Sequence, residues 1–142
     1  MYLIDTNIFL EILLEQEKAE DCSLFLQKVR KGNIKAVVST FSIHSISVIL
    51  SSLGKFTELE EFLSDIEYFK GLSIFNTTIT QEIEITKLAQ KEKLDFDDAL
   101  HFWIAKNFNL KIVSFDKHFD KLRIKKVEPS EIIQHKRNDF SK

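Results

Sequence analysis

The chain has 142 residues, of which 44% are hydrophobic and 30% are charged, and its formal net charge is −2. This length predicts one domain with a substantial core, and the near-neutral charge excludes a uniformly cationic nucleic-acid-binding protein. The single cysteine, Cys22, excludes an internal disulfide and suits a reducing compartment. No apolar run is long enough to cross a membrane and no signal peptide is recognisable, so we expect a soluble cytoplasmic protein.

Strands and helices are predicted from the spacing of apolar residues along the chain. In chain order they are strand 2–4, helix 7–15, helix 17–31, strand 34–39, helix 40–52, helix 57–70, strand 72–75, helix 80–93, a helix from Asp97 or Asp98 to Phe108, strand 111–115, strand 123–127 and a short helix 129–133. Strands that alternate with helices favour a parallel sheet covered on both faces. We therefore expect an α/β fold, a three-layer α/β/α sandwich with about five parallel strands. One domain would span residues 1–135, followed by a charged tail at 136–142.

Local signals mark several element ends. Gly32 is expected to close the second helix as a left-handed cap. Thr57, with Glu60 three residues later, has the capping-box pattern, and Thr80 is expected to open the helix after the third strand. We also expect a group of phenylalanines to lie in the core: Phe41, Phe56, Phe62, Phe69 and Phe75.

Three aspartates occupy comparable places in this pattern. Asp5 follows the first strand, Asp116 follows the fourth, and Asp98 lies in the first turn of the helix before that fourth strand. Because the carboxyl ends of parallel strands share one edge of a sheet, these side chains are expected to converge. Carboxylates that face one another repel unless a cation bridges them, and Mg²⁺ or Mn²⁺ is the natural bridge. Such an ion supports phosphodiester hydrolysis, which is the chemistry that the sequence predicts.

Each aspartate also has a simpler interpretation. An aspartate at a helix N-terminus is commonly a cap or a partner of the helix dipole. At least one of Asp95, Asp97 and Asp98 is expected to have only that role, and Asp5 alone would pass for a turn residue. Their combination in this strand context is less easily explained by folding.

Three segments carry a family resemblance: Y-L-I-D-T-N at residues 2–7, D-D-A-L-H-F-W-I-A-K at 97–106 and I-V-S-F-D-K-H-F-D at 112–120. In this order and separation they resemble the PIN-domain family. Within it the chain is most similar to the small ribonucleases of toxin–antitoxin modules (VapC-like) and their archaeal relatives. The resemblance extends from residue 2 to about residue 133.

The resemblance implies a central parallel sheet of about five strands and metal-dependent cleavage of RNA. It gives catalytic and metal-binding roles to Asp5, Asp98 and Asp116. Ser114 stands at the family's small hydroxyl position beside the last aspartate, and Asn7 would tie the first loop near the metal. An antitoxin protein is implied as a partner by the family alone.

One departure from the family concerns the helix after the second strand. The family has a glutamate there, in a pattern like S-x-x-T-x-x-E, whereas this chain has Ser39, Ser42 and Ser45. Serine supplies no charge, so the metal is expected to bind more weakly and a second metal is doubtful. The neighbouring His44 could serve as a nitrogen ligand and would favour Mn²⁺, although a histidine here is more often packed or on the surface.

Basic residues follow the last aspartate. Lys117 and His118 are expected to contact substrate phosphate, because phosphates must approach a site whose carboxylates repel them. Lysines in a charged protein also commonly serve only to solvate the surface. The helices of residues 40–70 carry more Ile, Leu and Phe than one domain needs to cover its sheet, which favours a homodimer.

The leading prediction is therefore a metal-dependent endoribonuclease, a candidate toxin of a toxin–antitoxin module. The alternative is a degenerate PIN domain that binds RNA or a protein partner with weak or no nuclease activity, because Ser45 replaces the family acid. A phosphatase of the haloacid-dehalogenase type would also open with an aspartate after its first strand. That mechanism needs a second aspartate two residues later, where this chain has Asn7.

Overall fold

A computed structural model of the chain describes residues 1–133. Its strands form one five-stranded sheet in the order β3-β2-β1-β4-β5, and every pairing is parallel. The strands are β1 (Tyr2–Ile4), β2 (Ala36–Ser39), β3 (Leu72–Phe75), β4 (Lys111–Val113) and β5 (Lys126–Val127). The predicted α/β fold is confirmed, and the predicted tail at 136–142 lies outside the described residues.

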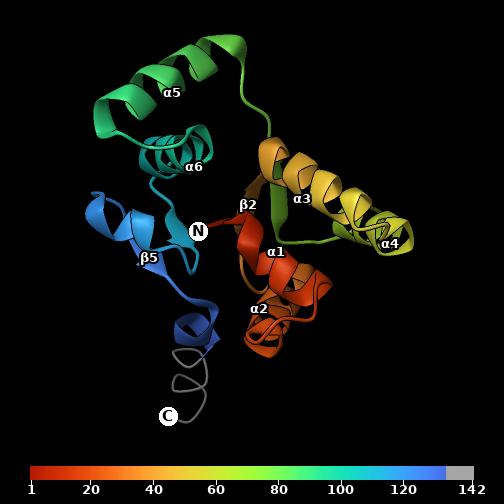
Figure 1. Cartoon of the computed structure of the whole chain (residues 1–142). Coiled ribbons are helices and arrows are strands. Elements are labelled where there is room, and N and C mark those ends of the chain that lie inside the picture. Colours follow the sequence, from red (N-terminus) through yellow and green to blue (C-terminus); the bar gives the residue numbers. More distant parts are fainter. Residues whose placement is uncertain (134–142) are drawn as a thin grey trace, which may run out of the picture.

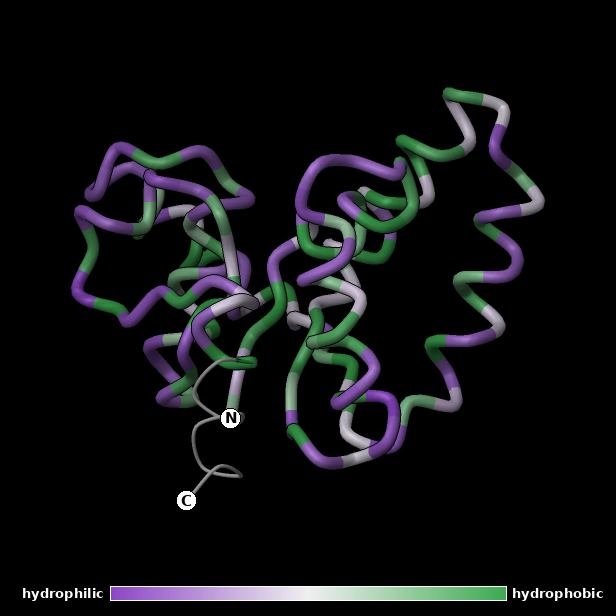
Figure 2. Tube along the Cα trace, turned by 90° about the horizontal axis from the view of Figure 1, so that it is seen from below, coloured by the Kyte–Doolittle hydropathy of each residue, from purple (hydrophilic) through white to green (hydrophobic). Residues whose placement is uncertain are grey.

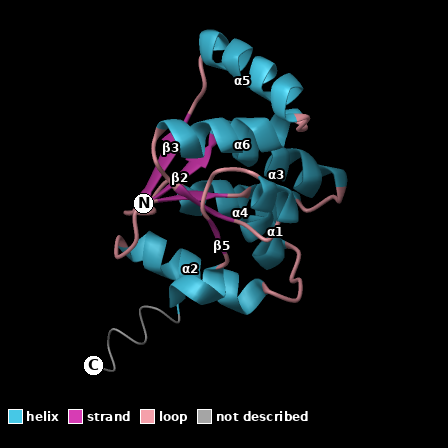
Figure 3. Ribbon diagram, turned by 90° about the vertical axis from the view of Figure 1, so that its left-hand side faces the viewer, coloured by secondary structure: helices cyan, strands magenta, loops and turns pink. Residues whose placement is uncertain are grey.

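Helices cover both faces of this sheet. They are α1 (Thr6–Leu13), α2 (Ala19–Lys31), α3 (Thr40–Ser52), α4 (Phe56–Ile66), α5 (Ile79–Glu92), α6 (Phe96–Asn107) and the 3₁₀ turn η1 (Lys117–Lys121), and residues 129–133 are also helical. Figure 1 shows α5 and α6 packed together at one end and α1 to α4 grouped apart from them. Figure 3 shows the strands between α6 and α2. No helix within residues 1–133 is long and apolar enough to cross a membrane.

The core is divided between the two faces of the sheet. Successive residues of a strand point to opposite faces, so Ile4 joins the cluster with α1 to α4, whereas Leu3 joins the cluster with α5, α6 and η1. Neighbouring strand β4 repeats this division with Val113 and Ile112. Along the outer helices in Figure 2, hydrophobic and hydrophilic residues alternate, as expected when one helix face covers a sheet. The sheet is therefore the middle of three layers, with one core cluster between it and the helices on each side.

Two predicted helix starts are wrong. Thr57 does not cap α4: Gly54 turns the chain in the left-handed region with φ of 72°, and the helix begins at Phe56 with no side-chain cap. The capping box of α5 belongs to Thr78 and Gln81 rather than to Thr80, because the backbone of Thr78 is extended and its hydroxyl accepts from the Gln81 N–H. A capping pattern is effective only where the chain enters the helix.

Other helix and strand ends agree with the prediction or differ from it by a few residues. Gly32 closes α2 in the left-handed region with φ of 87°, as predicted. The fourth strand stops at Val113, so Ser114 lies beyond it, and the fifth strand is shorter than predicted. The helix predicted to end at Lys70 ends at Ile66.

Two phenylalanines predicted in the core lie on the surface instead. Phe41 is 38% exposed, although its ring centroid lies 6.1 Å from that of Phe96 on α6, and Phe56 is 63% exposed at the start of α4. The remaining three phenylalanines of that prediction are partly buried against the core: Phe62, Phe69 and Phe75. Helical spacing alone does not tell which apolar residues a neighbour will cover.

The strand order places the functional site. From β1 the chain proceeds to β2 and β3 on one side, and then returns to β4 and β5 on the other. The boundary between β1 and β4 is thus a topological switch point, where open α/β sheets bind their ligands outside the carboxyl ends of the strands. Asp5 directly follows β1, and Ser114 directly follows β4.

Candidate metal centre

An open pocket lies at the switch point. Four carboxylates line it, namely Asp5, Asp97, Asp98 and Asp116, and the rest of its lining is Thr6, Asn7, Leu10, Phe41, Ser45, Ile49 and Phe96. These residues come from the end of β1, from one side of α1 and of α3, from the first turn of α6, and from the segment after β4. The three aspartates singled out in the sequence therefore share one pocket, although they lie in distant parts of the chain.

Ser114 connects Asp5 to Asp116. The Ser114 hydroxyl donates to Asp5 Oδ2 over 2.6 Å and accepts the backbone N–H of Asp116 over 2.9 Å. Ser114 is fully buried and Asp5 is 7% exposed, so water competes little for this bond. A hydroxyl has one proton to donate, and here it goes to a charged acceptor, which makes the bond stronger than a neutral one. Asp5 is thereby fixed relative to the loop that carries Asp116.

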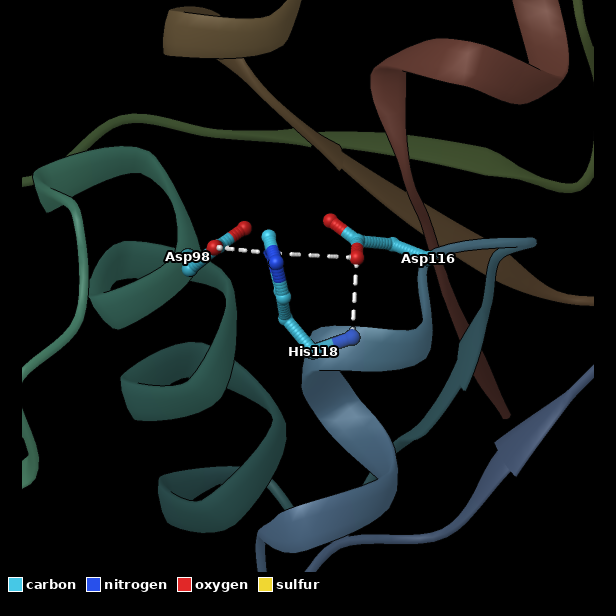
Figure 4. A group of neighbouring side chains, drawn as sticks. All are labelled: Asp98, Asp116 and His118. Atoms are coloured by element: carbon cyan, nitrogen blue, oxygen red, sulfur yellow. Dashed lines mark hydrogen bonds and ion pairs between the residues drawn. The ribbon is translucent and has the colours of Figure 1, made fainter.

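Asp98, Asp116 and His118 form a compact group, drawn in Figure 4. His118 Nδ1 lies 3.3 Å from Asp98 Oδ2 and 3.2 Å from Asp116 Oδ1, and the His118 backbone N–H donates to the same Asp116 oxygen over 2.9 Å. One ligand atom from each of the three residues lies within 4.8 Å of the others. The imidazole thus stands between the two carboxylates, at the mouth of the pocket.

The electrostatics of this group are unfavourable without a cation. Burial and, after it, the nearby carboxylates of Asp97 and Asp116 raise the pKa of Asp98 to about 6, whereas His118 opposes the rise. A carboxyl group shifted in this way marks a place where negative charges have been gathered against their mutual repulsion. A divalent cation would relieve that repulsion.

A buried chain of hydrogen bonds lies behind the pocket. His101 is 2% exposed, and its Nδ1 lies 2.7 Å from the carbonyl oxygen of Asp97 while its Nε2 lies 3.0 Å from Ser42 Oγ. Thr6 and Ser39 each donate a hydroxyl hydrogen bond to Ser42 Oγ, over 2.8 and 3.2 Å.

The proton positions in this chain follow from its acceptors. A carbonyl only accepts, so His101 Nδ1 donates to Asp97. Ser42 Oγ already accepts from Thr6 and Ser39, so its own proton is directed to His101 Nε2. The chain joins the first turns of α1, α3 and α6, which are the helices that line the pocket. It fixes the three walls relative to one another.

The other residues proposed from the sequence are scattered around this centre. Asn7 and Ser45 line the pocket, but the Ser45 hydroxyl donates to a carbonyl of its own helix. His44 lies exposed on α3 and does not line the pocket. Asp95 is the N-cap residue of α6 without a side-chain cap bond, and Lys117 lies exposed at the start of η1.

Sequence reasoning missed several features of the site. Asp97 was considered only as one of three adjacent aspartates, yet it lines the pocket while Asp95 does not. His101 lies in the D-D-A-L-H-F-W-I-A-K segment, but nothing in the sequence predicts its contacts with Ser42 and with the carbonyl of Asp97. In the sequence, this network is indicated only by the position of Thr6, which follows Asp5 and therefore lies close to the site.

Residues 2–125 match the PIN domain family. The chain is 31% identical over 134 residues to the VapC ribonuclease of Aquifex aeolicus (strain VF5), and the match covers 92% of this chain and 98% of that protein.

Two solved structures illustrate the likeness of the fold. The Sarcin-Ricin loop cleaving toxin VapC20 of Mycobacterium tuberculosis matches with a TM-score of 0.75 at 13% identity, over 91% of this chain and 100% of that one. VapBC2 of Rickettsia felis, bound to a DNA fragment from its promoter, matches with a TM-score of 0.66 at 16% identity, over 89% of this chain and 97% of that one.

Proposed function

This chain belongs to the PIN-domain family, and from that premise we propose that it is a divalent-metal-dependent endoribonuclease, the toxin of a toxin–antitoxin module. The proposal depends on one observation above all. Asp5, Asp98 and Asp116 line one pocket at the switch point of the sheet, in a chain similar along most of its length to a VapC ribonuclease.

The donor set of the pocket fits a hard divalent cation. Carboxylate oxygens are the ligands that Mg²⁺ and Mn²⁺ prefer, and the pKa of Asp98 is raised by burial and by the negative charges of Asp97 and Asp116. When bound, such an ion lowers the pKa of a water molecule and offsets charge on a phosphodiester. The imidazole of His118 adds a nitrogen donor beside Asp98 and Asp116, which favours Mn²⁺ among the two.

The side chains of the pocket have distinct roles in this proposal. Asp5, Asp98 and Asp116 bind the ion, and Ser114 orients Asp5 through its short hydrogen bond. Lys117, exposed next to Asp116, contacts a phosphate of the RNA and offsets the repulsion that the carboxylates exert on it. Hydrolysis by water would leave 5′-phosphate and 3′-hydroxyl ends.

Two protein partners belong to the proposal. A solved structure of similar fold is a toxin–antitoxin complex from Klebsiella pneumoniae, which supports an antitoxin as partner. A homodimer is supported by large apolar side chains that are exposed on α3 and α4: Phe41, Val48, Phe56 and Leu63. Its mass in solution, from light scattering, tests this part. We place the protein in the cytoplasm, where a ribonuclease toxin meets its RNA.

Cleavage of RNA by the purified protein tests the function. We expect cleavage with Mn²⁺ or Mg²⁺, none with EDTA, and none by the Asp5→Asn variant. Expression of the wild type in a bacterial host should arrest growth, whereas expression of Asp5→Asn should not. RNA cleavage by Asp5→Asn at the wild-type rate would overturn the assignment of this residue.

The alternative function is a binding module without nuclease activity, and Ser45 is the observation that favours it. If the site is too weakly charged to hold an ion, neither the wild type nor Ser45→Glu should bind Mn²⁺ in a calorimeter. RNA binding without cleavage in both proteins would then support the alternative. The phosphatase interpretation has no support from the family to which the chain belongs.

A further inference from the structure

The wall of the pocket formed by α3 carries no carboxylate. Its lining residues are Phe41, Ser45 and Ile49, which follow one another at helical spacing. Ser45 stands where the family resemblance places a glutamate, and its hydroxyl is engaged with the Phe41 carbonyl of its own helix over 2.9 Å. If an ion is held here, its charge must be offset from elsewhere.

The opposite wall carries an acid that the family resemblance does not assign. Asp97 lines the pocket together with Asp98, and one carboxylate oxygen of each lies within 4.8 Å of the other. The backbone of Asp97 is also fixed, because His101 donates a 2.7 Å hydrogen bond to its carbonyl oxygen.

We propose that Asp97 is the fourth carboxylate of the metal centre, and that it supplies from α6 the charge that Ser45 on α3 lacks. The inference rests on the proposed function. It needs no rearrangement of the fold, because Ser45 and Asp97 line the same pocket from different helices. Mg²⁺ and Mn²⁺ commonly keep several bound waters. A carboxylate on the α6 side of the ion can therefore bind it through one of these waters.

A simpler role for Asp97 is a favourable interaction with the dipole of α6. Asp97 lies in the first turn of the helix, where a negative side chain is favourable without any ligand. Asp95 supplies a matched control, because it is the N-cap residue of the same helix and its carboxylate lies within 4.8 Å of those of Asp97 and Asp98. Asp95 differs from Asp97 in that it does not line the pocket.

Mn²⁺ titration of the full chain, by calorimetry without RNA, separates the two roles. Asp97→Asn should weaken Mn²⁺ binding by roughly tenfold to 100-fold, and Asp95→Asn should change it by less than about threefold. Ser45→Glu should strengthen binding in the Asp97→Asn background more than it does in the wild type, since the two acids would serve one ion. Thermal melts of each variant confirm that the fold is retained, as expected for exposed positions.

Three results would overturn the inference. Equal weakening by Asp95→Asn and Asp97→Asn would mean that Asp97 acts only through its general field. No change with Asp97→Asn, or equal gains from Ser45→Glu in both backgrounds, would mean that Asp97 does not replace the family acid. A wild type that binds no Mn²⁺ contradicts the proposed function as well, whereas binding that is indifferent to Asp97 contradicts this inference alone.

Discussion

The two walls of the pocket, α3 and α6, have similar positions and opposite character. Both helices line the pocket, yet α6 contributes Asp97 and Asp98 whereas α3 contributes Phe41, Ser45 and Ile49. The backbone thus provides two places from which a carboxylate can reach an ion, and single residues decide which place is used. A site of this kind can lose an acid from one helix and keep its charge through another.

The largest expected effect comes from removing charge at the α6 wall. Asp98→Asn keeps the shape of the side chain but removes a ligand, so RNA cleavage with Mn²⁺ should fall by at least about 100-fold. Cleavage of a labelled RNA under single-turnover conditions measures it. Asp120→Asn is the control, because Asp120 pairs with Lys126 outside the pocket and its loss should leave cleavage near the wild-type rate.

The next prediction concerns the buried hydrogen bonds of His101, which join the walls of the pocket. His101→Ala removes a buried side chain that joins the Asp97 carbonyl to Ser42, and should lower the free energy of unfolding by about 2–4 kcal/mol. Urea denaturation measures the change. His44→Ala is the matched control: His44 is exposed on α3, so its loss should change stability by less than about 0.5 kcal/mol. Similar losses in both variants would contradict the structural role of the network.

The pH dependence of stability tests the cost of placing the negative charge of Asp98 on the α6 wall. The folded, metal-free protein holds the pKa of Asp98 at about 6, above its value in the unfolded chain. Between roughly pH 4 and pH 6 the unfolded chain therefore binds fewer protons, and stability falls as the pH rises through this window.

Asp98→Asn removes this dependence. In EDTA it should be more stable than the wild type at pH 7 by about 1 kcal/mol, after screening by solvent at this open site, and the difference should vanish below about pH 4. Thermal unfolding at several pH values measures it. A wild type that gains stability relative to the variant as the pH rises would show that the charge of Asp98 is favourable in the metal-free fold.

The smallest expected effect comes from adding an acid to the α3 wall. Ser45→Glu in the wild-type protein should tighten Mn²⁺ binding by only a few-fold, about 1 kcal/mol, if Asp97 already supplies the charge. Calorimetry with Mn²⁺ measures the gain, and Ser45→Gln controls for the change in size. A gain much larger than this would indicate that the site of the wild type is short of one acid.

Much of the fold could be predicted from the sequence because its signals are local. The β-branched run at residues 34–39 and the apolar runs around it predicted strands in a parallel sheet, which the strand order confirms. The place of the site followed from the same pattern, since Asp5 and Asp116 each follow a strand. Asp98 was indicated by its place at the start of the helix before the fourth strand, and the resemblance to a family added Ser114. The structure places both beside these acids.

Tertiary structure alone decided which neighbouring residues act together. Asp95, Asp97 and Asp98 are nearly equivalent in sequence, but in the folded chain Asp97 and Asp98 line the pocket whereas Asp95 does not. The bonds of His101 join residues up to 59 positions apart, and no local pattern encodes them. Sequence determines the chemistry available at each position, whereas packing determines which of those groups share a space small enough to interact.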